Sequence, residues 1–136
     1  MSRVILLAAD HPLPLYESGL RRVRTSREGG YTVTCEEEGF SVQAHIYYQS
    51  GVDELELDIR PFRYEVNLAP TREDARLLRD YLSACCAPGE QVELWNLWLT
   101  GTRARPFHLS GRLSQLEEDT LRQLEEREQT CITITV

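Results

Sequence analysis

Hydrophobic and polar residues alternate along much of the first half of the chain, and this pattern predicts β-strands. Residues 4–9 form a short apolar run, which is typical of a buried strand. Four later stretches alternate with a period of two, at 31–35, 40–48, 55–59 and 64–68. The first two flank a glutamate-rich turn at 36–39 and predict a hairpin. The polar, arginine-rich segment 18–30 predicts a loop.

Near position 70 the hydrophobic spacing changes to that of an α-helix, and it predicts a helix over 71–86. The apolar stripe of this helix consists of Ala75, Leu78, Leu82 and Cys85. Thr71 and Asp74 stand three residues apart at the start, as in a capping box. A Pro-Gly pair at 88–89 ends the helix.

The last third of the chain returns to strands around a second helix. Residues 92–99 are apolar on both faces and predict an interior strand. A short strand at 107–109, a helix at 115–127 and a strand at 131–136 follow. The order of elements predicts an α+β fold over a single domain, 1–136. We expect a mixed, mostly antiparallel sheet, built from an N-terminal strand plus a meander, with two helices in a C-terminal β-α-β-α-β segment.

Charge and composition narrow the classes of function. The chain has 136 residues, a net charge of -7 and fifteen basic residues that are all arginine. An acidic protein is a poor ligand for nucleic acids and for anionic membranes, so we expect neither as a partner. The apolar run near the N-terminus is too short for a signal peptide or a membrane span, which favours a soluble cytoplasmic protein. The arginine cluster Arg21, Arg22, Arg24 and Arg27 suits an acidic partner or the chain's own acidic strands.

Residues 8–14 read Ala-Ala-Asp-His-Pro-Leu-Pro, and residues 93–99 read Glu-Leu-Trp-Asn-Leu-Trp-Leu before a loop and a leucine-rich acidic helix. These two segments resemble an uncharacterised family of small bacterial proteins, mostly from Gram-positive organisms. The resemblance covers roughly a third of the chain. It implies a similar fold and a bacterial or mobile-element source, and it implies no activity.

Motifs of catalysis and metal binding are missing from the sequence. The cysteines are Cys35, Cys85, Cys86 and Cys131, and they contain no Cys-x-x-Cys pair. We expect structural thiols, no metal, no cofactor and no catalytic residue.

One candidate ligand site depends on topology. If the strands at 63–68 and 92–99 are parallel, then Asn67, Thr71, Arg103 and Arg105 share one edge of the sheet. A helix N-terminus with two arginines nearby would bind an anion. The alternative is a solvated basic loop.

Candidate partner-binding residues are Asp10 and His11, where a strand ends, and Trp95 and Trp98, which lie on opposite faces of a strand. Core packing is the alternative for both tryptophans. The leading hypothesis is a non-catalytic protein-binding protein of the inhibitor or immunity type, whose acidic surface captures a basic partner. The alternatives are a small enzyme or an anion or nucleotide sensor at the 67–71/103–105 edge, and a structural subunit of a homo-oligomer.

Overall fold

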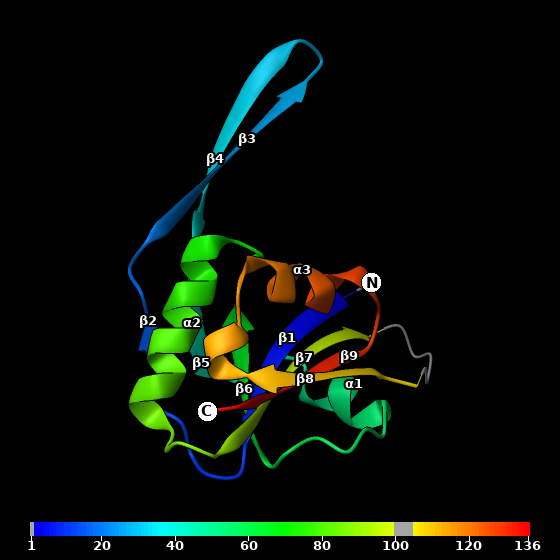
Figure 1. Ribbon diagram of the computed structural model, residues 1–136. Coiled ribbons are helices and arrows are strands. Elements are labelled where there is room, and N and C mark those ends of the chain that lie inside the picture. The colour runs from blue at the N-terminus through cyan, green and yellow to red at the C-terminus, as the bar shows by residue number, and fades with distance from the viewer. Residues whose placement is uncertain (1, 100–104) are drawn as a thin grey trace.

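A seven-stranded sheet forms the centre of the computed structural model, which describes residues 2–99 and 105–136, with Arg24 described by its backbone alone. In spatial order the strands are β2 (Tyr16–Glu17), β5 (Ser41–Ala44), β6 (Phe62–Asn67), β1 (Ser2–Ala9), β7 (Gln91–Leu99), β9 (Thr130–Thr135) and β8 (Phe107–Arg112). Neighbouring strands are antiparallel except β8 and β9, which are parallel (Figure 1). The α+β class with a mixed, mostly antiparallel sheet is therefore confirmed.

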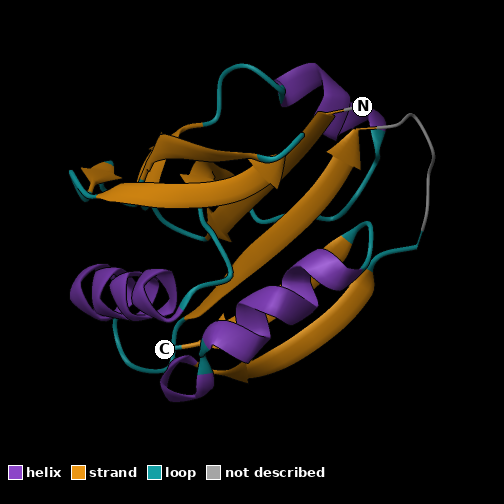
Figure 2. Ribbon diagram, turned by 90° about the horizontal axis from the view of Figure 1, so that it is seen from above, coloured by secondary structure: helices purple, strands orange, loops and turns teal. Residues whose placement is uncertain are grey.

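The N-terminal strand occupies the middle of this sheet. β1 is antiparallel to both β6 and β7, so β6 and β7 run in the same direction on either side of it. Helix α2 (Arg72–Cys85) connects them. The short 3₁₀ helix η1 (Leu113–Gln115) and helix α3 (Glu118–Glu126) connect the parallel pair β8 and β9. Helices α2 and α3 lie on one face of the sheet, and helix α1 (Gln49–Glu54) lies on the other (Figure 2).

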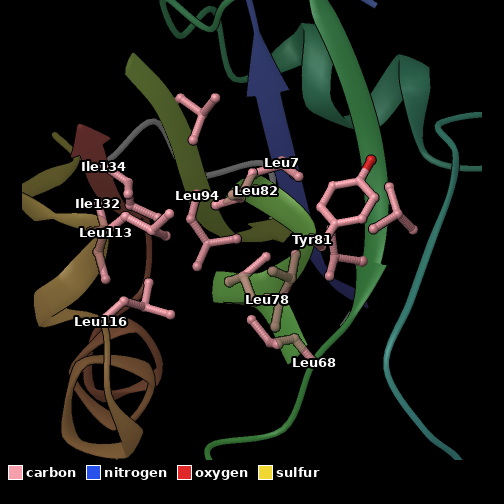
Figure 3. Close-up of a cluster of buried hydrophobic side chains, with 14 of the residues drawn as sticks. Leu7, Leu68, Leu78, Tyr81, Leu82, Leu94, Leu113, Leu116, Ile132 and Ile134 are labelled. Carbon is pink, nitrogen blue, oxygen red and sulfur yellow. The ribbon is translucent and has the colours of Figure 1, made fainter. Parts of the chain in front are cut away.

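The larger core lies between the sheet and the α2–α3 layer (Figure 3). Ile5, Leu7 and Ala9 of β1 point into it, because successive side chains of a strand alternate between faces. Leu78 and Leu82 of α2 meet them and are fully buried. Thr71 caps α2 as the sequence predicts, since its Oγ1 accepts a hydrogen bond of 3.1 Å from the Asp74 N–H.

A smaller core covers the opposite face under α1. Val4, Leu6 and Ala8 of β1 pack there, together with Trp95 and Leu97 of β7. β1 and β7 are therefore buried on both faces, which confirms the interior strand predicted at 92–99.

Two strands stand apart from this body. β3 (Arg21–Glu28) and β4 (Tyr31–Glu38) form a separate two-stranded ribbon that projects well beyond the rest of the molecule (Figure 1). The predictions of a loop at 18–30 and a turn at 36–39 are therefore wrong. Neither face of the ribbon is buried in a core, and β3 lacks the alternation of apolar residues that would mark it as a strand. The turn lies instead at Gly29-Gly30, where φ is +57° and +84°.

The prediction of a strand at 55–59 is also wrong. Residues 49–54 form α1, and 57–61 contain no regular structure. Val52 and Leu55 are buried in the smaller core with Ile59, and the three-residue step between the first two is helical spacing. The apolar residues at 55, 57 and 59 therefore alternate with polar ones without forming a strand. They belong to the end of α1 and to the loop that follows it.

Candidate functional site

The projecting ribbon, residues 21–38, is the most prominent surface feature, and we call it the arm. It continues the paired strands β2 and β5 of the main sheet across a short irregular step. Ser18 N–H donates to the Phe40 carbonyl at 3.1 Å, and Gly39 N–H donates to the Leu20 carbonyl at 2.8 Å. A Cβ at Gly39 would lie 2.6 Å from the Leu20 oxygen, so only glycine fits there without a shift of the backbone. The root of the arm is therefore closely packed.

Arg22 fixes the root of the arm to helix α2. Its guanidinium donates to the Asp74 carboxylate at 2.5 Å and to Asn67 Oδ1 at 3.2 Å. Asp74 is buried and also accepts from the Ala69 N–H at 2.8 Å. An arginine from the arm thus neutralises a carboxylate in the first turn of α2.

Beyond its root the arm is exposed. Val23 is 64% and Tyr31 is 77% accessible, although valine is usually buried and tyrosine is usually at least partly covered. Arginines lie on β3 and glutamates on β4, with Arg21 opposite Glu38 and Arg22 opposite Glu37. Arg21 and Arg22 therefore lie opposite an acidic part of their own chain, one of the two partners expected for the cluster, whereas Arg24 and Arg27 lie opposite Cys35 and Thr32.

The predicted anion site is only partly assembled. Asn67 ends β6, and Thr71 is the N-cap of α2 four residues later. Arg105 is exposed and lies just before β8. In the sheet, β8 is separated from β6 by three strands, β1, β7 and β9. Arg103 lies outside the described residues. At the N-terminus of α2, Asn67 and the helix itself are engaged by Arg22 and Asp74, which are groups of the same chain.

Asp10 and His11 follow β1 and are both paired. Asp10 forms an ion pair with Arg60. The backbone N–H of Arg60 donates to Glu93 Oε1 at 3.0 Å, so this residue joins the loop before β6 to strand β7. His11 Nε2 lies 2.6 Å from Glu90 Oε2. The two residues thus sit in a charged network at the end of β1.

The two tryptophans differ in environment. Trp95 is buried in the smaller core, and its indole N–H donates to Glu93 Oε1 at 3.2 Å. Trp98 is half-buried, and the Arg3 guanidinium carbon lies 6.0 Å from its ring centroid, within reach of a cation–π contact.

No family model, curated protein or solved structure matches this chain. Among the described residues, no helix combines the length and the apolar character needed to cross a membrane. Function is therefore inferred from the surfaces themselves.

Proposed function

We propose that the chain is a non-catalytic protein-binding protein, of the inhibitor or immunity type, and that the arm is its recognition element. The observation that carries this proposal is the arm itself: a two-stranded ribbon held out from the body, with no third strand joining it within the described residues. An isolated ribbon of this kind is marginally stable in water. A partner that adds a strand would stabilise it and would gain main-chain hydrogen bonds.

The pairing register defines which backbone groups are available to a partner. Glu28 and Tyr31 flank the two-residue turn as a hydrogen-bonded pair, and hydrogen-bonded and open pairs then alternate along the ribbon. Thr25 and Thr34 form one of the open pairs. Their N–H and C=O groups point outward, away from the opposite strand. A change at Thr25 therefore tests whether a partner binds the outer edge of β3, and a change at Thr34 tests the outer edge of β4.

The charge distribution favours a basic partner on the outer edge of β4. This strand ends in three consecutive glutamates, and the chain as a whole carries a net charge of -7. β4 continues into β5, which pairs with β6 as far as Asn67. An added strand would therefore extend the sheet from the point where β6 ends. Complementary charge would speed the encounter and fix its orientation.

A small enzyme, or a sensor of anions or nucleotides at the 67–71/103–105 edge, is the alternative. It has less support, because Asn67 accepts a hydrogen bond from Arg22 and Arg105 lies across three strands from it.

Site-specific photo-crosslinking in the source cells tests the proposal. A benzoylphenylalanine placed at Tyr31, at the tip of the arm, should capture one basic protein. The same replacement at Tyr47, which is 85% accessible on the body, is the matched control and should not capture it. The captured protein is then purified, and its binding to the full chain is measured by calorimetry.

The two edges are separated by proline substitutions at the paired threonines. Thr34→Pro removes an outward N–H of β4 while sparing the bonds between β3 and β4. We expect it to weaken binding by at least tenfold. Thr25→Pro makes the same change on β3 and should weaken binding much less. Equal capture from Tyr31 and Tyr47, or a complex that tolerates both proline variants, would contradict the proposal.

A further inference from the structure

Three groups that can bind a metal ion lie close together near the C-terminal end of α2, and Cys85 adjoins them, whereas the arm contacts the first turn of this helix. His11 follows β1, Cys85 and Cys86 end α2, and Glu90 precedes β7. The ligand atoms of His11, Cys86 and Glu90 all lie within 4.8 Å of one another. The sulfur of Cys85 lies 3.8 Å from that of Cys86. Three separate segments of the chain therefore bring a nitrogen, an oxygen and two sulfurs together.

We propose that His11, Cys85, Cys86 and Glu90 form a binding site for a zinc ion. Nitrogen, sulfur and carboxylate ligands around a tetrahedral zinc ion lie about 2.0–2.3 Å from the metal, and hence roughly 3.3–3.8 Å from one another. The two sulfurs already have this separation. His11 Nε2 and Glu90 Oε2 are closer, at 2.6 Å, and would move apart around the ion. Thiolate ligands also select zinc over magnesium and calcium, which prefer oxygen.

The orientation of His11 supports this assignment. Its Nδ1 lies 3.0 Å from the Pro12 carbonyl oxygen, which can only accept, so Nδ1 carries a proton. Nε2 is thereby directed toward Glu90, at 2.6 Å. Histidines that ligate metals are commonly held in this way, with the other ring nitrogen donating to a carbonyl or carboxylate. Without a metal, a proton must lie between Nε2 and the carboxylate, and a zinc ion would replace it.

A catalytic thiol is the main alternative for Cys86, and its environment argues against one. Cys86 is only 7% accessible, whereas reactive cysteines lie in partly exposed, electropositive surroundings. A bound zinc ion would take the thiolate as a ligand and displace the thiol proton.

The site also has a route for entry. Cys86 is 7% accessible and lines a surface groove of about 660 Å³ with Ser83, Pro88 and Thr135. His11 and Glu90 are themselves partly exposed. A metal ion bound there would join the end of β1, the end of α2 and the start of β7.

Titration of the reduced, chelator-treated full chain with Co²⁺ and then Zn²⁺ tests the proposal. Cobalt should give a thiolate-to-cobalt charge-transfer band and the intense visible bands of tetrahedral Co²⁺, saturating at one equivalent. Zinc should displace the cobalt and raise the melting temperature, because the ion binds the folded state.

Cysteine variants locate the site. Cys86→Ser removes one of the two proposed thiolate ligands and should weaken the charge-transfer band, and the double variant Cys85→Ser, Cys86→Ser should abolish it. Cys35→Ser, which changes an exposed thiol on the arm, should leave the band intact. His11→Gln and Glu90→Gln change partly exposed groups, so they keep the proposal testable if Cys86→Ser does not fold. Each should weaken cobalt binding by about tenfold or more. Absence of the band in the wild-type chain, or an unchanged band in folded Cys86→Ser, would overturn the assignment. This outcome is independent of the protein-binding proposal, since no ligand belongs to the arm.

Discussion

The guanidinium of Arg22 lies 2.5 Å from the carboxylate of Asp74 and joins the arm to the first turn of α2. Asp74 is nearly inaccessible, so removal of its partner leaves a buried charge that is only partly compensated. We expect Arg22→Ala to lower the free energy of unfolding by about 2–3 kcal/mol. Urea denaturation measures this loss.

A double-mutant cycle with Asp74→Ala isolates the contribution of the pair. Arg27→Ala is the control, because Arg27 belongs to the same strand but is exposed near the tip of the arm. If Arg22→Ala and Arg27→Ala cost equally little, the contact between Arg22 and Asp74 does not anchor the arm in solution.

The core under α2 gives a second prediction. Leu82 is fully buried, and Leu82→Ala should destabilise the protein by about 2–5 kcal/mol, because it removes apolar contacts and leaves a cavity. Leu15→Ala, at an exposed leucine, should change stability by less than about 0.5 kcal/mol. Chemical denaturation of the two variants compares them directly.

The turn of the arm requires a left-handed backbone at two successive residues, Gly29 and Gly30. There is open space around both, so a substitution there acts through the backbone conformation alone. Gly29→Asn should preserve the arm, since Asn-Gly is the favoured pair in this type of turn. Gly30→Val should destabilise the arm by about 1 kcal/mol or more. Amide hydrogen exchange along β3 and β4 should therefore be faster in Gly30→Val only, and equal exchange in the two variants would contradict this reading of the turn.

Asn96 supports the end of α3 from within β7. Its fully buried side-chain amide donates to the carbonyls of Leu124 at 3.0 Å and Arg127 at 3.2 Å. Asn96→Leu should cost about 1–3 kcal/mol, because it leaves these carbonyls without their donor. Asn96→Asp should cost more, since it also places a negative charge beside them. If thermal unfolding shows a smaller loss of stability for Asn96→Asp than for Asn96→Leu, the hydrogen bonds donated by the amide do not stabilise the end of α3.

Cys131 predicts a loss of stability in alkaline solution. Burial raises the pKa of its thiol from 9.0 to about 12. The unfolded chain therefore releases this proton first, and the stabilisation present below about pH 9 is lost as the pH rises toward 12. Cys131→Ala should show a shallower decline than the wild type in urea titrations of the metal-free, reduced protein over this range. If the free energy of unfolding falls equally with pH in both proteins, ionisation of the Cys131 thiol does not contribute to the loss of stability.

Much of the fold follows from local sequence patterns. Thr71 and the apolar stripe behind it define α2, and the apolar runs at 4–9 and 92–99 define the two central strands. The arm was missed because β3 has no buried face, so its pairing with β4 is invisible to hydrophobic periodicity. The Gly29-Gly30 pair was the available signal, since two glycines suit a two-residue hairpin turn.

The metal-binding candidates could not be grouped from sequence spacing. His11 and Glu90 are 79 residues apart, and they meet because β1 and β7 are antiparallel, with Ala8 opposite Glu93. That pairing places the residues after β1 beside those before β7. Only the sheet topology contains this information.

The position of β9 constrains the order of events during synthesis. β9 is the ninth strand along the chain, yet it lies between β7 and β8, which are made earlier. β8 has no neighbour in the sheet until residues 130–135 have left the ribosome. Residues 107–112 therefore cannot join the sheet before residues 130–135 do, and this side of the sheet is completed last.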